Sequence, residues 1–339
     1  FPALKEYRKI WNTFEPFALF ATVVFILFAL ILFIVGSRDS KLERPGFIER
    51  SLVHNLSSKI AALPMVLTAV GVFVIATLWT VYHSFTNSRM LPKSEFIGLA
   101  QYERLWSSDR WYMSIENLAI YGACSLIFSL VIGFMLAALL DQKTRFENTF
   151  RTIFLYPFAL SFIVTGLVWQ WILNPEYGVE KIVRSIGFES FVFNPLYNID
   201  IVIYGILAAG LWQGTGFIMC LMLAGLRGID QEIWKAARID GIPMWKTYIQ
   251  IVIPMMRPVF ITTLVIIAAG IIKVYDLVVA QTSGGPGISS EVPAKYVYDY
   301  MFGAQNLAQG FAASTMMLVS VLIVLIPFTY LEFGRRKNA

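Results

Sequence analysis

The stretch from Gly228 to Pro258 reads GIDQEIWKAARIDGIPMWKTYIQIVIPMMRP, and it is the longest charged, helix-patterned segment between two strongly apolar ones. Asp230 can cap the N-terminus of a helix, because a short side-chain oxygen satisfies free backbone amides there. Gly241 can end that helix, since glycine accepts the left-handed conformation at low cost. Pro254 and Pro258 then interrupt the chain before the next apolar run. The pattern predicts a short helix–turn–helix with one face available to a water-soluble partner.

The composition places the chain among integral membrane proteins. Of its 339 residues, 57% are hydrophobic and only 14% are charged, whereas a soluble domain carries about 25% charge. Spanning segments of this kind are helices, because lipid cannot satisfy open backbone groups. The formal net charge of +5 fits basic cytoplasmic loops that face anionic lipid, and it does not indicate nucleic acid.

Seven apolar runs are close to the length that crosses a bilayer. They predict an all-α, multi-pass helical bundle. Lys and Arg cluster between runs one and two, three and four, and five and six, and again after run seven, so these flanks and the C-terminus are expected in the cytoplasm. The runs are Pro16–Gly36, Ile60–Ser84, Leu118–Leu140, Thr152–Leu173, Ile201–Leu226, Pro258–Gln281 and Phe311–Phe333.

The charged stretch also resembles the EAA loop of permease subunits in binding-protein-dependent ABC importers, whose pattern is E-A-A-x-x-D-G followed by an aromatic residue, Ile and a hydrophobic residue before Pro. The matching positions are Ala236, Ala237, Asp240, Gly241, Tyr248, Ile251, Ile253 and Pro254. The resemblance implies that this loop, 228–257, docks on a cytoplasmic ATPase. It departs from the pattern at Lys235, where the family has Glu, so either Lys235 meets an acidic partner or Glu232, one turn earlier, compensates.

A second motif narrows the resemblance to the sugar-importing branch that includes the maltose permease. Residues 281–287 read QTSGGPG, and an aromatic-rich segment, 296–302, follows. Sugar permeases of this branch carry a similar T-x-G-G-P-G turn, and residues 274–310 look most like permeases for α-glucosides. The resemblance implies a bacterial inner-membrane protein that is not an enzyme and binds no cofactor or metal. Its implied partners are a second permease subunit, two ATP-binding subunits and a periplasmic sugar-binding protein.

Polar and small residues inside two apolar runs are candidates for the substrate pathway. Gln213, Gly214 and Phe217 lie in run five, where the alternatives are close helix packing by small residues or the wall of a cavity. In run six, Lys273 and Asp276 are three residues apart and so share one helical face, with Tyr275 beside them. They could form a functional pair or simply an ion pair near the membrane surface.

The domain organisation predicted from these runs has two parts. Residues 1–58 form an N-terminal extension with one transmembrane helix and a cytoplasmic linker, and residues 59–339 form a six-helix permease core. Lys5 and its basic neighbours precede the first run on the side expected to be outside, so either an upstream helix is absent or a charged N-terminus is translocated. The rival function is a self-sufficient channel or secondary transporter that uses Lys273 and Asp276.

Overall fold

The structure is a computed structural model, and it describes residues 64–65, 68–92, 95–142, 145–272 and 274–336. The chain divides into two units, Phe1–Trp79 and Thr80–Ala339. The first unit contains the π-helix η1, Ala69–Ile75, and the beginning of α3, Ala76–His83. The predicted span Pro16–Gly36 lies outside the described residues.

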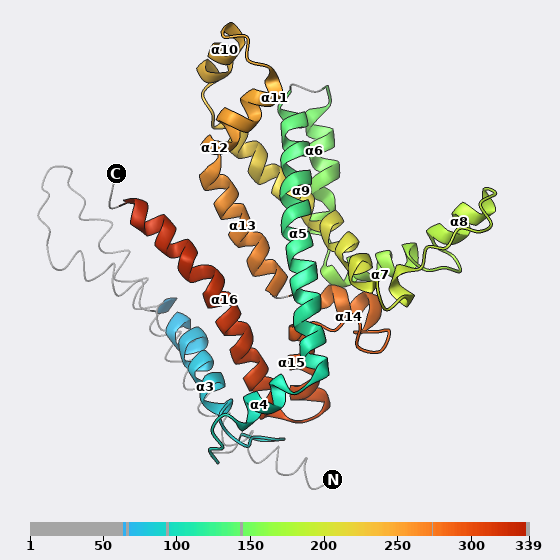
Figure 1. The fold of residues 1–339 in the computed structure, drawn as a ribbon, viewed down its shortest axis with the longest axis vertical. Coiled ribbons are helices and arrows are strands. Elements are labelled where there is room, and N and C mark those ends of the chain that lie inside the picture. The colour runs from blue at the N-terminus through green and yellow to red at the C-terminus, as the bar shows by residue number, and fades with distance from the viewer. Residues whose placement is uncertain (1–63, 66–67, 93–94, 143–144, 273, 337–339) are drawn as a thin grey trace, which may run out of the picture. The chain divides into compact units, whose positions relative to one another are not determined.

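The second unit is helical, which confirms the predicted all-α class for the described part of the chain (Figure 1). Its longer helices are α5 (Asp109–Asp141), α9 (Val202–Arg227), α13 (Arg257–Ile272) and α16 (Leu307–Arg336). The remaining helices are α4 (Ala100–Trp106), α6 (Glu147–Leu155), η2 (Tyr156–Ala159), α7 (Phe162–Ile172), α8 (Val179–Ser185), η3 (Pro195–Tyr197), α10 (Gln231–Ile239), α11 (Met244–Thr247), η4 (Tyr248–Val252), α12 (Ile253–Met255), α14 (Asp276–Thr282), α15 (Pro293–Tyr298) and η5 (Asp299–Gly303).

Helices α5 and α9 pack against each other along much of their lengths (Figure 1). Small residues recur every fourth position on the buried face of α5, at Ser125, Ser129, Gly133 and Ala137, and they let two apolar helices approach closely. A Cβ atom at Gly133 would lie only 2.7 Å from the side chain of Ile218. Among the described residues, these two helices are long and apolar enough to cross a membrane, and the count reaches four if two bent helix pairs each form one span.

The structure corrects the predictions for runs four and six. Run four was predicted as one span, but α6–η2 and α7 meet at an angle of 101°. Run six was also predicted as one helix, but α13 ends at Ile272 and α14 begins at Asp276. Lys273 lies outside the described residues, and the helix is already interrupted at Val274. Run six is therefore not one continuous helix, and the pairing of Lys273 with Asp276 stays a prediction.

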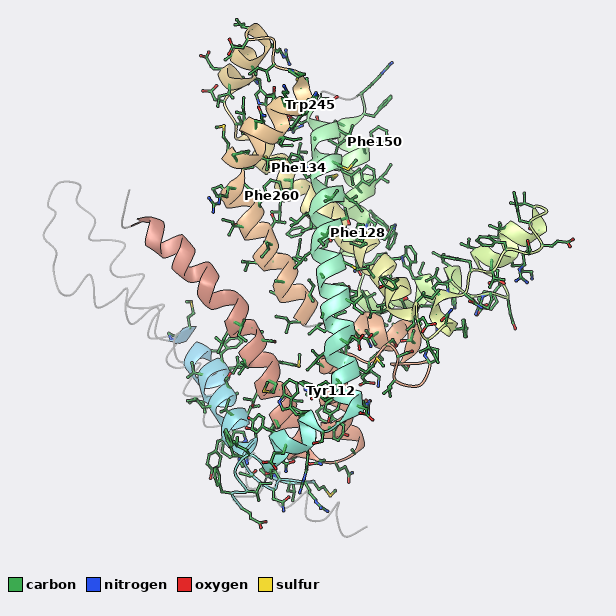
Figure 2. The ribbon with its side chains drawn as sticks, in the orientation of Figure 1. Tyr112, Phe128, Phe134, Phe150, Trp245 and Phe260 are labelled. Atoms are coloured by element: carbon green, nitrogen blue, oxygen red, sulfur yellow. The ribbon has the colours of Figure 1, made fainter. Side chains whose placement is uncertain are left out.

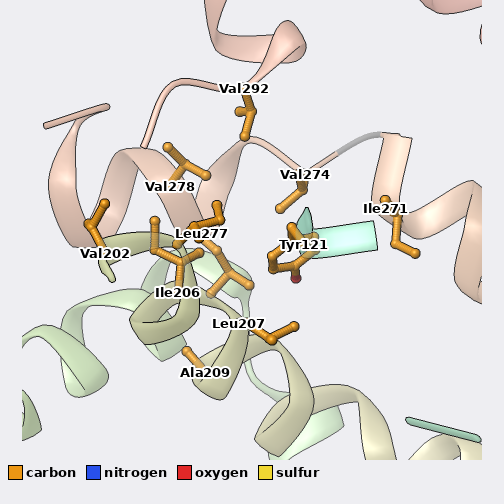
Figure 3. Packing of buried hydrophobic residues seen from close by; sticks show 11 residues of the cluster. Tyr121, Val202, Ile206, Leu207, Ala209, Ile271, Val274, Leu277, Val278 and Val292 are labelled. Atoms are coloured by element: carbon orange, nitrogen blue, oxygen red, sulfur yellow. The ribbon is translucent and has the colours of Figure 1, made fainter. Parts of the chain in front are cut away.

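Three clusters of buried apolar side chains hold the second unit together. One cluster surrounds Tyr121 of α5, where Leu207 of α9 and Leu277 of α14 converge (Figure 3). A second cluster lies toward the end where α5 meets α6, and it includes Met219, Met222 and Met256. The third joins α4, α5, α15 and α16 around Trp111 and Tyr296. Van der Waals contacts among these buried side chains supply most of the energy that holds the helices together.

Candidate functional site

Helix α10 has the boundaries that its sequence predicts. The amide of Glu232 donates to the side chain of Asp230 over 2.9 Å, so Asp230 is the N-terminal cap. At the other end Gly241 has a φ of +69°, the left-handed conformation that favours glycine. The amide of Ile242 then donates to the carbonyl of Ala237 over 2.9 Å, which closes the last turn. Local chemistry therefore sets the length of this helix.

The two faces of α10 differ sharply. Ala237 is buried, and Ile233 and Trp234 pack against the apolar cluster around Met222 and Met256. The opposite face is open, and Ile239 at its end is 84% exposed. That open face carries Gln231, Glu232, Lys235, Ala236 and Arg238. Such a helix can bind a partner through one face while the other stays attached to the bundle.

The residues predicted to contact the ATPase lie on both the inner and the open face of α10. Glu232, Lys235, Ala236 and Asp240 are exposed, whereas Ala237 faces inward. Within the described part of the chain, neither Glu232 nor Lys235 forms an ion pair, so both charges are available to a partner. Pro254 lies apart from α10, in α12, where its ring is exposed. The structure thus brings most, but not all, of the predicted residues together on one short helix.

Two of the three predicted pathway residues of α9, Gln213 and Phe217, contact the bend before α7. Gln213 is 2% exposed, and its side-chain amide donates to the carbonyl of Leu160 over 2.7 Å, at the bend between η2 and α7. This bond satisfies a carbonyl that the bend leaves without a helical partner. The ring of Phe217 stacks on Phe158 of η2, with centroids 4.6 Å apart. A Cβ atom at Gly214 would meet no heavy atom within 4 Å.

The other predicted pathway residues lie at the break between α13 and α14. Asp276 is the first residue of α14 and is exposed. The centroid of the Tyr275 ring lies 5.3 Å from that of Tyr298, the last residue of α15. The structure therefore places Tyr275 and Asp276 beside the segment that follows α14. Gln213 and Phe217 instead contact the bend before α7.

Sequence reasoning missed a network of four charged side chains between the start of α5 and the α14–α16 connection. Arg110 pairs with Glu291 over 2.9 Å and also with Asp299. Lys295 pairs with Asp299 over 2.6 Å and lies 3.7 Å from Glu291. Nearby, the side-chain amide of Asn117 donates to the carbonyls of Ser289 and Glu291. These contacts fix the QTSGGPG turn and the residues after it to α5.

Burial and pairing act in opposite directions on the two acids. The pKa of Glu291 is raised because burial disfavours its charge more than Arg110 and Lys295 favour it. For Asp299, burial also raises the pKa, but hydrogen bonds from Lys295 and Arg110 outweigh it, so the pKa is lowered. Burial therefore outweighs pairing at Glu291, whereas pairing outweighs burial at Asp299.

Replacing Arg110 by alanine is expected to destabilise the protein in a pH-dependent way. The change leaves Glu291 buried with one cation fewer, a loss of about 3 kcal/mol, the lower end for a broken buried pair because Arg110 is partly exposed. Without Arg110 the pKa of Glu291 rises further, so Glu291 takes up a proton as the pH falls and the loss shrinks. Thermal unfolding in detergent at pH 7.5 and pH 5 measures both effects.

The double variant Arg110→Ala with Glu291→Gln is the matched control. It removes the stranded charge while keeping the shape of the side chain, so it should recover part of the lost stability at pH 7.5. An equal loss of stability at both pH values, with no recovery in the double variant, would contradict the role given to Glu291.

Comparison with known proteins adds to this geometry. The model of the family "binding-protein-dependent transport system inner membrane component" matches residues 129–337. A probable ABC transporter permease protein of Pyrococcus horikoshii is 36% identical over 270 residues, covering 79% of this chain and 92% of that protein. A trehalose/maltose transport system permease protein of Thermococcus litoralis is 29% identical over 281 residues, covering 81% and 92%.

The fold has a solved counterpart. A chain in the crystal structure of a bacterial ABC transporter that imports the acidic polysaccharide alginate superposes with a TM-score of 0.72. The two chains share 18% sequence identity, and the match covers 85% of this chain and 98% of that one. The likeness extends over most of both chains and supports the helical fold.

Proposed function

Since the chain belongs to the family of binding-protein-dependent transport system inner membrane components, we propose that it is the permease subunit that carries an α-glucoside or a related oligosaccharide into the cytoplasm. The observation that carries this proposal is α10, a short helix held by its inner face with its outer face open. The trehalose/maltose permease relative and the QTSGGPG turn support the choice of sugar.

The proposed mechanism is alternating access driven from outside the chain. Two ATPase subunits close on ATP, and their motion pushes α10 through its open face. A second permease subunit completes the pathway. Binding energy shifts such an equilibrium only by the difference between the affinities for its two states. The ATPase must therefore bind α10 with different affinity in its open and closed forms. The basic residues Arg227, Arg238 and Lys246 support a cytoplasmic location for this end of the bundle.

A sugar-loaded binding protein is proposed to dock at the opposite end. The segments concerned are Asn174–Asp200, which contains α8, and Ser283–Gly310, which contains α15. Figure 1 shows both segments lying away from α10 within the second unit. The charged network of Arg110 holds the second segment in place, so that a partner meets a preformed surface, which lowers the cost of binding.

Reconstitution of the assembled importer tests this proposal. The complex is extracted through a tag on this chain, and its ATP hydrolysis is measured in proteoliposomes with its binding protein. Maltose, trehalose and sucrose are compared with a pentose and with no sugar. Stimulation by an α-glucoside with ATP-dependent uptake supports the proposal. Recovery of this chain alone, moving solute without ATP, would contradict the coupling role of α10, and stimulation by the pentose alone would contradict the choice of sugar.

A further inference from the structure

Tyr248 lies where the inner face of α10 meets the helical bundle. It is the first residue of η4, and its ring lies 5.2 Å from that of Trp234 in α10, edge to face. On its other side the ring lies 6.2 Å from Phe134 of α5. Phe134 continues the contact to Phe260 of α13, at 5.5 Å. An unbroken aromatic series thus leads from α10 into two helices of the bundle.

Figure 2 shows where this series enters the bundle: Phe134 and Phe260 face each other from α5 and α13. All four rings pack against the same buried cluster of Met219, Met222 and Met256. Close-packed interiors transmit displacement because neighbouring groups have no free space to absorb it. A shift of Trp234 must therefore move Tyr248 or open a void beside it.

The end of α5 lies close to Tyr248. The side chains of Gln142, the residue that follows α5, and of Asp141, its last residue, are near enough to act on the Tyr248 hydroxyl. The neighbouring Asp141 lies 3.8 Å from Arg227, the last residue of α9. Arg227 in turn donates to Glu147, the first residue of α6, over 2.6 Å. The ends of α5, α9 and α6 are therefore joined by charged side chains beside Tyr248.

We propose that Tyr248 is a positioning residue that transmits the displacement of α10 to α5, and through the Asp141–Arg227–Glu147 group to α9 and α6. This inference rests on the proposed function of α10 as the ATPase-docking helix. The ring carries the displacement from Trp234 to Phe134, and so to the end of α5 at Asp141. Because α6 leads into the 101° bend before α7, movement at this point reaches the middle of the bundle.

The test measures sugar uptake and ATP hydrolysis in the same proteoliposomes. Tyr248→Ala is expected to assemble with its partners and to hydrolyse ATP, while the sugar moved per ATP falls at least tenfold. Tyr248→Phe keeps the ring and should retain most of this ratio. Tyr112→Ala is the matched control, because Tyr112 is 53% exposed near the other end of α5 and lies outside this series. Its ratio should equal that of the unaltered chain.

The outcomes separate this inference from the proposed function. An unchanged ratio in folded Tyr248→Ala would overturn the role of Tyr248. If that variant does not assemble, Trp234→Leu provides the same test, since it keeps apolar volume but removes the edge contact, and a normal ratio there would also overturn the inference. Loss of sugar-dependent ATP hydrolysis in the unaltered complex would instead count against the proposed function.

Discussion

The variant Ala236→Trp is expected to lose sugar uptake, to a hundredth or less of the normal rate, while reaching the membrane in normal amount. Ala236 is exposed on the open face of α10, between Lys235 and the buried Ala237. Because this position is exposed, an indole ring there should leave folding intact. It would, however, hold a docked ATPase subunit away from the helix, and close packing is what makes such contacts strong.

Two controls make this expectation specific. Ala236→Ser nearly preserves the volume of the side chain and should retain most of the uptake. Ala119→Trp places the same indole on an exposed position of α5 and should leave the ATPase attached. The measurement is recovery of ATPase subunits with the tagged chain, together with uptake in vesicles. Normal uptake by Ala236→Trp would show that α10 is not a closely packed docking element.

Gly241 gives a weaker version of the same test because two effects coincide there. Its φ of +69° strains any residue with a side chain, so a bulky replacement alters the end of α10 as well as its surface. A change at Ala236 leaves both the Asp230 cap and the left-handed turn intact. Loss of uptake at Ala236 therefore reports on docking, whereas loss at Gly241 reports on docking and helix termination together.

The sequence predicts α10 well because its determinants are local. Asp230, Gly241 and the apolar stripe between them act within a few residues of each other, and they set the observed boundaries. The same local pattern carried the resemblance to permeases of ABC importers, and the QTSGGPG turn narrowed it to the sugar branch; the family match and the relatives confirm this resemblance. The predicted multi-pass helical class is confirmed for the same reason, since long apolar runs are a strong signal.

The bends and the charged network could not be predicted in this way. Hydropathy measures the length of an apolar run, but the direction of the backbone at Leu160 depends on a hydrogen bond from Gln213, 53 residues away. Arg110 and Glu291 are 181 residues apart in the chain, and neither has a local pattern that indicates its partner. Such contacts exist only after the helices pack, so a single sequence carries little trace of them.

The glycines of α9 show how the structure separates two readings that the sequence left open. Gly214 and Gly216 are two residues apart in run five, and both fit either helix packing or a pathway wall. A Cβ atom added at Gly216 would overlap the carbonyl oxygen of Phe154 in α6, and it would lie 3.1 Å from the Cα atom of Leu155. Backbone atoms cannot move aside as a flexible side chain does. Gly216 is therefore a packing residue, whereas Gly214 has open space.

Gly216→Val is accordingly expected to push α6 away from α9 and to prevent stable folding. Overpacking a core costs about 1–3 kcal/mol where side chains can adjust, and the loss here should reach or exceed the upper value because the obstacle is backbone. Gly214→Ala is the matched control, and it should keep a normal thermal midpoint in detergent. Size-exclusion profiles and melting curves of both variants provide the measurement. If Gly216→Val folded as well as Gly214→Ala, the contact between α6 and α9 would not be the one described here, and the bend that depends on it would need another origin.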